Sequence, residues 1–265
     1  MKKILLAAFA LSAFFTAHSA TFTSNVVSGD WSVMGSWTVV GFDANGIPDL
    51  DDDVTIVAGH TIRLMGLSDC RDLTVSAGGT LNYNNKTLYI RSNYVRAGST
   101  TASGVLYFFG SLKTITITGT YSNGGNWNFM NGSNYTIAAG ATIVKTNYFY
   151  VNSGAVLTNL AVVNLTGGSV STSGTGTFIN GVNATLAVAR PFLGPVANFN
   201  FSAAGNMIRY SSTLTPNILF TTYHHLDLIN TAGTKTWSGG TLTVNGNLRI
   251  FAGCTLNCAS QDINL

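Results

Sequence analysis

Apolar and polar residues alternate along this chain in a ten-residue pattern that occurs five times. The pattern places apolar residues at its second, fourth and tenth positions and glycine at its seventh. Alternation with a period of two predicts a strand with one buried face, and glycine, which accepts a positive φ, predicts a sharp corner after it. Each copy therefore predicts two short strands joined at a glycine corner. The copies are DVTIVAGHTI (53–62), DLTVSAGGTL (72–81), NYTIAAGATI (134–143), YFYVNSGAVL (148–157) and NLRIFAGCTL (247–256).

The spacing of the copies indicates how they assemble. Successive starts lie 19 residues apart (53 to 72) and 14 apart (134 to 148), which suits a solenoid with loops of varying length better than a propeller of identical blades. A single coil is one layer thick and cannot bury its apolar face, whereas coils stacked about 4.8 Å apart pair every strand and enclose a continuous core. We therefore predict an all-β, single-stranded parallel β-helix, or β-solenoid, of roughly ten coils.

Composition supports this fold class and narrows the partners. The chain has no Glu, only one Gln and few Lys, while Thr, Val, Ile, Asn and Gly are abundant, a composition that favours strands and turns over helices. Charged residues make up 9% of the chain, and the formal net charge of +3 becomes +1 once Lys2 and Lys3 are set aside (3 − 2 = 1). So little charge predicts no nucleic-acid partner.

The first twenty residues have the pattern of a secretory signal peptide. Lys2 and Lys3 precede an apolar run (4–15) that is followed by small residues, so we expect cleavage after Ser19 or Ala20. The run is shorter than the roughly 20 residues that span a bilayer, and no comparable run follows, so we predict no membrane span. The mature chain is expected to be secreted, either extracellular or on the outer cell surface.

The mature chain divides into a cap and a solenoid. Residues 21–52 depart from the repeated pattern and contain Trp31 and Trp37, which we expect to cover the first coil as an N-terminal cap. Residues 53–265 carry the solenoid repeats. Because the sequence stops at QDINL as another strand begins, we expect the solenoid to continue beyond this C-terminus, or to associate end to end through its open coil.

Two stretches resemble a known family of proteins. Residues 29–64 resemble the opening of secreted repeat proteins of Bacteroidetes-type bacteria, which have a Trp pair, a Pro before an Asp-rich turn and then D-V-T-I…G-H-T-V. Residues 223–257 are similar to a recurring unit of the same proteins. The resemblance implies a right-handed parallel β-solenoid on or outside the cell surface, often within adhesin-like polypeptides that are commonly exported by the type IX route. The matching residues of the first stretch are Trp31, Trp37, Pro48, Asp52, Asp53, Val54, Ile56, Gly59 and His60.

The three cysteines are expected to be unpaired. Cys254 and Cys258 lie four residues apart in a predicted strand, a separation of about 13 Å, whereas the Cα atoms of a disulfide lie within about 7 Å. Cys70 is distant along the chain. We interpret all three as small, buried apolar side chains.

The segment DANGIPDLDDD (43–53) is a candidate metal site. Its carboxylate and amide oxygens are the hard ligands that Ca²⁺ prefers, and they lie in a glycine-containing loop. A single copy lacks the tandem array that accompanies many such loops, so a solvated acidic turn is the alternative. The candidate ligands are Asp43, Asn45, Asp49 and Asp51, with Asp52 and Asp53 following.

Aromatic clusters are the candidate binding residues. The stretches 107–110, 126–131 and 146–152 are rich in Tyr, Phe and Trp, and aromatic rings exposed on a flat sheet can stack on sugar rings. We name Trp127, Tyr148 and Tyr150 as candidates for glycan stacking. The alternative is that the aromatic rings stack inside the solenoid.

Catalytic chemistry has little support in the sequence. All ten acidic residues are Asp, and none lies between Asp72 and Asp227, whereas glycoside hydrolysis normally needs two facing carboxylates. Asp69 and Asp72 with two neighbouring arginines are better interpreted as ion pairs. His225 and Asp227 share a strand face, but no nucleophile motif accompanies them.

We therefore predict a non-enzymatic structural or adhesive β-solenoid of the cell surface or extracellular space, with no catalytic residue and no cofactor apart from the candidate Ca²⁺. Its expected partner is a cell-surface or extracellular polysaccharide, or a protein. One alternative is a carbohydrate-binding module that uses exposed aromatic residues. The other is a polysaccharide lyase or hydrolase built on a β-helix.

Overall fold

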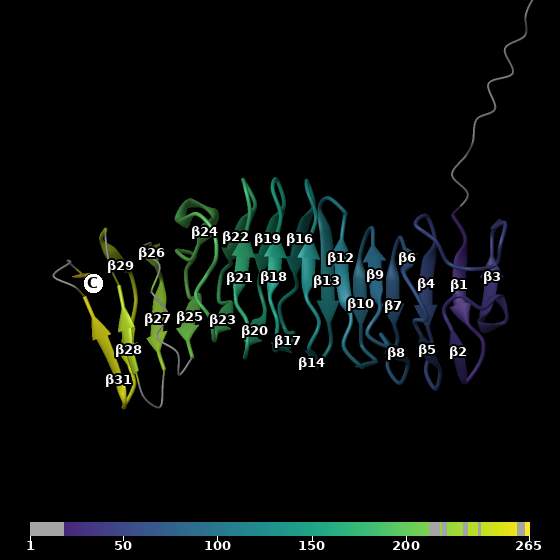
Figure 1. The fold of residues 1–265 in the computed structure, drawn as a ribbon, viewed down its shortest axis with the longest axis horizontal. Helices are drawn as coiled ribbons and strands as arrows, with labels where there is room; N and C mark the ends of the chain where they lie inside the picture. The colour runs from purple at the N-terminus through teal and green to yellow at the C-terminus, as the bar shows by residue number, and fades with distance from the viewer. Residues whose placement is uncertain (1–18, 212–217, 219–221, 230–232, 238–239, 259–262) are drawn as a thin grey trace, which may run out of the picture.

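The chain forms a rod of stacked strands. The computed structural model describes residues 19–211, 218, 222–229, 233–237, 240–258 and 263–265, so nearly all of the predicted signal peptide (1–20) lies outside the described residues. Strands follow one another along the long axis from the N-terminal end to the C-terminal end (Figure 1). The stack is a parallel β-solenoid of about nine turns, which confirms the predicted all-β fold.

The largest sheet runs along the N-terminal two thirds of the rod. Every neighbouring pair in it is parallel except β1 and β3, which are antiparallel. In spatial order the strands are β24 (Phe199–Asn200), β22 (Thr177–Asn180), β19 (Val156–Asn159), β16 (Asn134–Ile137), β13 (Lys113–Ile117), β10 (Tyr94–Arg96), β7 (Leu73–Val75), β4 (Asp53–Ile56), β1 (Thr21–Ser24) and β3 (Trp37–Val40).

Two more long sheets complete the walls of the rod. One has six parallel strands: β21 (Val170–Thr172), β18 (Phe149–Val151), β15 (Trp127–Phe129), β12 (Val105–Phe108), β9 (Thr87–Ile90) and β6 (Ser68–Cys70). The other has seven: β14 (Thr120–Asn123), β17 (Thr142–Lys145), β20 (Val162–Leu165), β23 (Thr185–Val188), β25 (Met207–Tyr210), β27 (His225–Leu228) and β30 (Leu248–Ile250).

Shorter sheets lie towards the two ends. Near the N-terminal end are β11 (Ser99–Thr101), β8 (Thr80–Asn82), β5 (Thr61–Arg63) and β2 (Ser28–Asp30). Near the C-terminal end are β26 (Thr222–Tyr223), β29 (Leu242–Val244) and β32 (Ile263–Asn264), and the pair β28 (Gly233–Thr236) and β31 (Cys254–Asn257). Two 3-10 turns, η1 (Met34–Ser36) and η2 (Val196–Asn198), also belong to the described residues.

Glycine corners join the strands as the repeated pattern predicts. The seventh residue of each copy has a φ between 72° and 86°, a region that side chains with a Cβ rarely occupy. This confirms the strand–corner–strand interpretation for all five copies, at Gly59, Gly78, Gly140, Gly154 and Gly253.

The core consists of the inward-facing residues of successive coils. Because parallel strands pair in register, equivalent side chains lie directly above one another, and aromatic rings form stacks within the rod. Phe108 and Phe129 stack with ring centroids 5.0 Å apart and an angle of 12° between their planes. Trp127 and Phe149 stack at 5.2 Å and 17°.

The segment 21–52 closes the N-terminal end of the rod. β1 extends the parallel ladder of β4, and β3 folds back antiparallel onto β1. Trp31 and Trp37 are buried and pack edge to face at 5.4 Å, and the indole N–H of Trp37 donates to the carbonyl oxygen of Trp31 at 2.9 Å. The tryptophan pair thereby covers apolar surface that the first coil would expose.

The cysteines are unpaired, but only one is buried. Cys70 is buried in the core, whereas Cys254 and Cys258 are partly exposed, and all three are free thiols. The expectation of three buried side chains is therefore wrong for the last two. In the described part of the chain β31 pairs only with β28, so Cys254 lies in a narrow sheet that covers it incompletely.

None of the helical segments in the described residues is long and apolar enough to cross a membrane.

Candidate functional site

A column of tyrosines lies on the outer face of the six-stranded sheet. Residues that pair in register on β9, β12, β15 and β18 are Tyr89, Tyr107, Asn128 and Tyr150. Their side chains are partly exposed, while the residues that flank them along each strand are buried in the core. Strand alternation therefore presents three phenol rings and one amide to solvent along one line of the rod.

The structure corrects the expectation that Trp127 is exposed. Trp127 is completely buried and packs against Phe149 and Tyr121 inside the coil. Asn126 and Asn128, its neighbours along the chain, take the outward positions instead. Trp127 therefore cannot stack on an external sugar, because the alternation of side chains along β15 directs its ring into the core.

Tyr148 and Tyr150 are both partly buried aromatic residues near β18. Both are partly exposed, and their ring centroids are 5.7 Å apart with an angle of 31° between the planes. They are two residues apart, so they share the outer face at β18. The exposure predicted for these two candidates is present.

Tyr89 is a member of the column that sequence reasoning missed. Its ring contacts those of Tyr107 and Phe109 at 5.1 Å and 5.5 Å. The guanidinium of Arg91 lies 4.4 Å from the centroid of Phe109 and forms an ion pair with Asp69. The alternation Thr87-Leu88-Tyr89-Ile90 carries the signal that would have placed Tyr89 outside.

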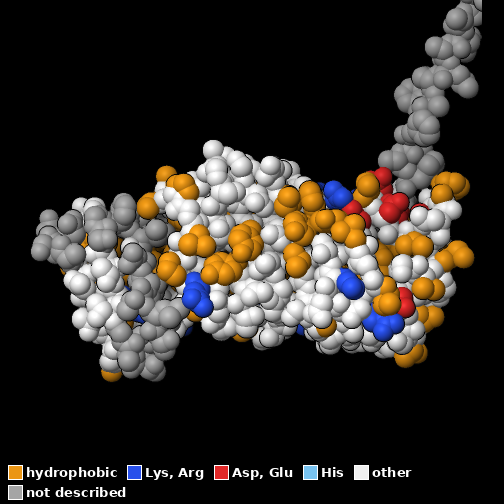
Figure 2. Space-filling model, viewed as in Figure 1, with side chains coloured by type: hydrophobic (Ala, Val, Ile, Leu, Met, Phe, Trp, Pro, Cys, Tyr) orange, Lys and Arg blue, Asp and Glu red, His pale blue; other side chains and the backbone are white. Residues whose placement is uncertain are grey.

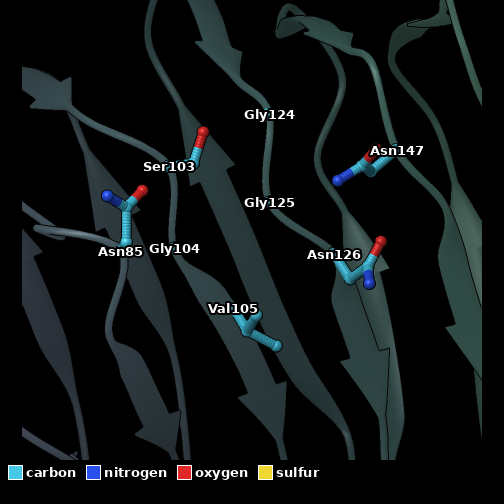
Figure 3. Close-up of a pocket in the computed structure, with 8 residues that line it drawn as sticks. All are labelled: Asn85, Ser103, Gly104, Val105, Gly124, Gly125, Asn126 and Asn147. Atoms are coloured by element: carbon cyan, nitrogen blue, oxygen red, sulfur yellow. The ribbon is translucent and has the colours of Figure 1, made fainter.

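A groove of about 270 Å³ borders this aromatic face. Figure 3 shows its glycines between polar side chains of neighbouring coils, with Asn85 and Ser103 on one side and Asn126 and Asn147 on the other. The lining residues are Asn85, Ser103, Gly104, Val105, Gly124, Gly125, Asn126 and Asn147, and none of them is charged.

The groove exists because two coils approach closely at glycine. A Cβ added to Gly125 would lie 1.5 Å from the carbonyl oxygen of Gly104, a clash that no local adjustment relieves. A Cβ added to Gly104 would lie 2.4 Å from the Cβ of Tyr83. Both positions therefore require glycine, and backbone forms this part of the groove.

The groove amides differ in how they are held. The Asn126 side-chain oxygen accepts a hydrogen bond from the Tyr148 backbone N–H at 3.3 Å, which ties the groove to the aromatic face. Asn85 has a φ of 57°, a left-handed conformation that asparagine tolerates. Among the described residues, the side-chain amides of Asn85 and Asn147 form no hydrogen bond to the protein, so they can bond to solvent or a ligand.

A buried lysine lies behind the groove floor. The side chain of Lys145 points into the core, where its amine donates to the carbonyl oxygens of Gly125 and, at 3.5 Å, Asn123. The amine lies 5.1 Å from the ring centroid of Trp127. Burial lowers the pKa of Lys145 from 10.5 to about 7. No ion pair among the described residues includes this amine, and its bond to Gly125 ties the groove floor to the core.

The acidic loop brings together three of its carboxylates. Carboxylate oxygens of Asp43, Asp49 and Asp52 lie within 4.8 Å of one another. The Asn45 side-chain oxygen accepts the Ile47 backbone N–H at 2.7 Å. Asp51 is outside the group. Of the predicted ligands, Asp43 and Asp49 are therefore adjacent, and Asp52 lies beside them.

Asp52 has a structural function in this loop. It is buried and accepts hydrogen bonds from the backbone N–H groups of Ala20, at 2.8 Å, and Asp49, at 2.9 Å. Burial raises the pKa of the Asp52 carboxyl, while these two backbone bonds oppose the rise. The carboxylate therefore fastens the start of β1 to the acidic loop, and Ca²⁺ binding stays a prediction.

The remaining charged candidates form ion pairs between coils. Arg91 pairs with Asp69, and Arg71 pairs with Asp53. Asp227 is fully buried and pairs with Arg249 at 2.6 Å and with Arg209 at 3.2 Å. His225 accepts the Asn247 backbone N–H at its Nδ1 atom, at 3.0 Å. This arrangement agrees with the ion-pair interpretation, and it leaves the Asp227 carboxylate enclosed by arginines.

No protein-family model, curated protein or solved structure matches this chain. The resemblance to secreted repeat proteins therefore stays a prediction.

Proposed function

We propose that this protein is a non-enzymatic, exported structural or adhesive rod of the cell surface or extracellular space. The observation that supports this proposal best is the parallel stack of about nine turns with one continuous core. Each coil is hydrogen-bonded to the next along its length, which gives a stiff element suited to spacing or display. The signal-peptide pattern of residues 1–20 supports export.

The distribution of carboxylates supports a non-enzymatic role. The sequence between Asp72 and Asp227 contains no acidic residue, so the long middle of the rod lacks the acid–base pair of a glycoside hydrolase. The acidic residues that bound this stretch are engaged by arginines: Asp72 by Arg71, and Asp227 by Arg209 and Arg249.

A second candidate function is carbohydrate binding, which the outward tyrosine column favours. Partly exposed phenol rings on a flat sheet, interleaved with amides, match the apolar faces and hydroxyl groups of sugars. On the face shown in Figure 2, hydrophobic side chains gather over the middle of the rod, in the region where β9, β12 and β18 are labelled in Figure 1. This second function adds to the first, because an adhesive rod needs a contact surface.

Labelling of intact and lysed cells of the producing bacterium tests the proposal. An antibody against the folded rod should label intact cells or the culture medium, and deletion of the gene should reduce attachment to surfaces. Purified protein incubated with polysaccharides should release neither reducing ends nor unsaturated sugar ends. Confinement of the protein to the cell interior, or release of sugar ends, would contradict the proposal.

A further inference from the structure

We propose that the tyrosine column and the amide groove form one binding site for a neutral polysaccharide whose chain lies along the axis of the rod. This inference deepens the carbohydrate-binding function proposed above and rests on it. The site has two parts: the column of Tyr89, Tyr107, Asn128 and Tyr150, and the groove lined by Asn85, Ser103, Asn126 and Asn147.

The two parts belong to the same strands and form one surface. Val105 and Asn126, which line the groove, lie two residues before Tyr107 and Asn128 of the column. Tyr148 connects them again, because its backbone N–H bonds the Asn126 side chain while its ring contacts that of Tyr150. A ligand on the column is therefore within reach of the groove amides.

The direction of the ligand follows from the repeat of the rod. Equivalent outer positions recur about every 4.8 Å along the axis, a step close to the length of one pyranose unit in an extended chain. Tyr89, Tyr107 and Tyr150 occupy three of four successive coils, and Asn128 occupies the other. A linear polysaccharide that runs along the axis can place one sugar unit at each coil.

The chemistry of the site selects an uncharged ligand. The outer positions of β12, β15 and β18 and all of the groove lining lack charged residues. Arg91, at the edge of the column, is already paired with Asp69, and Lys145 is buried beneath the floor. Lys86, at the turn beside Asn85, is exposed. One exposed amine is far less than the positive surface that concentrates an acidic polymer, whereas amides and phenols bond neutral hydroxyl groups.

Sheet stability alone does not account for these residues. Cross-strand aromatic contacts stabilise a sheet, and this explains the pairing of Tyr89 with Tyr107. It does not account for the position of the partly exposed Asn147 amide, which bonds none of the described residues, beside a hollow over backbone. A sugar that lies in the hollow can bond this amide through its hydroxyl groups.

Affinity electrophoresis of the full chain tests the inference. Native gels containing soluble neutral polysaccharides (a mixed-linkage glucan, a xyloglucan, a mannan) are compared with gels containing acidic ones (alginate, polygalacturonate). The variants are Tyr150→Ala and Asn147→Ala, and Phe251→Ala serves as the control, because it removes an exposed ring elsewhere on the rod. Circular dichroism confirms that each variant is folded.

The expected result is retardation by at least one neutral polysaccharide. Tyr150→Ala should weaken binding about five- to tenfold, as the loss of one ring contact implies. Asn147→Ala should weaken it about threefold, as the loss of one hydrogen bond implies, and the control should bind normally. Affinity for oligosaccharides should rise with length up to about four units, one for each coil of the column.

Four results would overturn the inference, and they differ in what else they affect. Binding of acidic polysaccharides alone, full affinity for a disaccharide, or loss of binding in Tyr150→Ala but not in Asn147→Ala would each refute the site as described and leave carbohydrate binding standing. Absence of binding to every polysaccharide would refute carbohydrate binding as well, and would leave the structural or adhesive role alone.

Discussion

The buried amine of Lys145 should make the stability of the rod depend on pH in a way that one substitution removes. In the folded chain its pKa is lowered to about 7 by burial, compared with an ordinary value of 10.5. Below pH 7 the amine is charged in both the folded and the unfolded state. Between pH 7 and pH 10.5 it is neutral when folded and charged when unfolded, so the unfolded state binds more protons, and stability rises with pH.

The size of the effect follows from the separation of the two pKa values. One pH unit well above the folded pKa corresponds to about 1.4 kcal/mol of unfolding free energy. Because the folded amine is still half charged at pH 7, the step from pH 7 to pH 9 corresponds to roughly 2 kcal/mol. Lys145→Met keeps an apolar stem in the core and removes the titrating group. The stability of the variant relative to the original protein should therefore fall by roughly 2 kcal/mol between pH 7 and pH 9.

Denaturant unfolding followed by tryptophan fluorescence measures this difference, because Trp127 lies against the amine. Free energies are extrapolated to water at pH 6, 7, 8 and 9. Other ionisable groups are common to both proteins and cancel in the comparison. Lys86→Met is the matched control, since it removes an exposed amine. Parallel stability curves for Lys145→Met and the original protein between pH 7 and pH 9 would refute the reasoning.

Three further predictions concern packing and the acidic loop. Gly125→Ala should prevent folding or lower the melting temperature strongly, because its Cβ would lie 1.5 Å from a backbone oxygen of the preceding coil, whereas Gly66→Ala, which meets nothing within 4 Å, should melt normally. Asp52→Ala leaves two backbone N–H groups without their acceptor and should cost about 1–3 kcal/mol in denaturant unfolding; a loss no larger than that of Asp51→Ala, at a partly exposed position, would contradict its structural role. The solvated-turn interpretation predicts that millimolar Ca²⁺ leaves the melting temperature unchanged, and a rise that Asp43→Asn abolishes would instead establish an ion site.

The strands and corners could be predicted from the sequence because both depend on local chemistry. Val54 and Ile56 alternate with polar residues and face the core, and the glycine of each repeated pattern has a positive φ. Neither feature needs knowledge of a neighbouring coil. The stacking of coils followed as well, because a layer with one apolar face must be covered by another.

Which residues of the aromatic stretches face outward could not be predicted as securely as the strands and corners. In 146–152 nearly every central position is aromatic or apolar, so hydrophobicity alone does not say which face is buried. The neighbouring coils determine which face is buried. Trp127 and Phe149 stack in the core and thereby direct Asn126, Tyr148 and Tyr150 outward. The prediction that Trp127 is exposed was wrong for this reason.

The groove was not visible in the sequence because its residues come from four coils. Asn85, Ser103, Asn126 and Asn147 lie 18 to 23 residues apart along the chain, and the loops between them differ in length. A shift of one residue in any coil would move an amide to the other face. The register of the strands, which only the structure supplies, brings these four side chains together.

The outer surface of the rod is organised by columns that run across coils, and these columns separate two kinds of chemistry. The ion pairs of Asp53 and Asp69 link successive coils near the N-terminal end, and those of Asp227 link coils beyond the middle. On the face in Figure 2 the acidic side chains likewise lie towards the N-terminal end. The tyrosine column lies between these regions, and its four strands, β9, β12, β15 and β18, contain no carboxylate. A ligand that spans several coils there meets rings, amides and hydroxyl groups, and this sequence of contacts favours a long neutral chain over a short or a charged one.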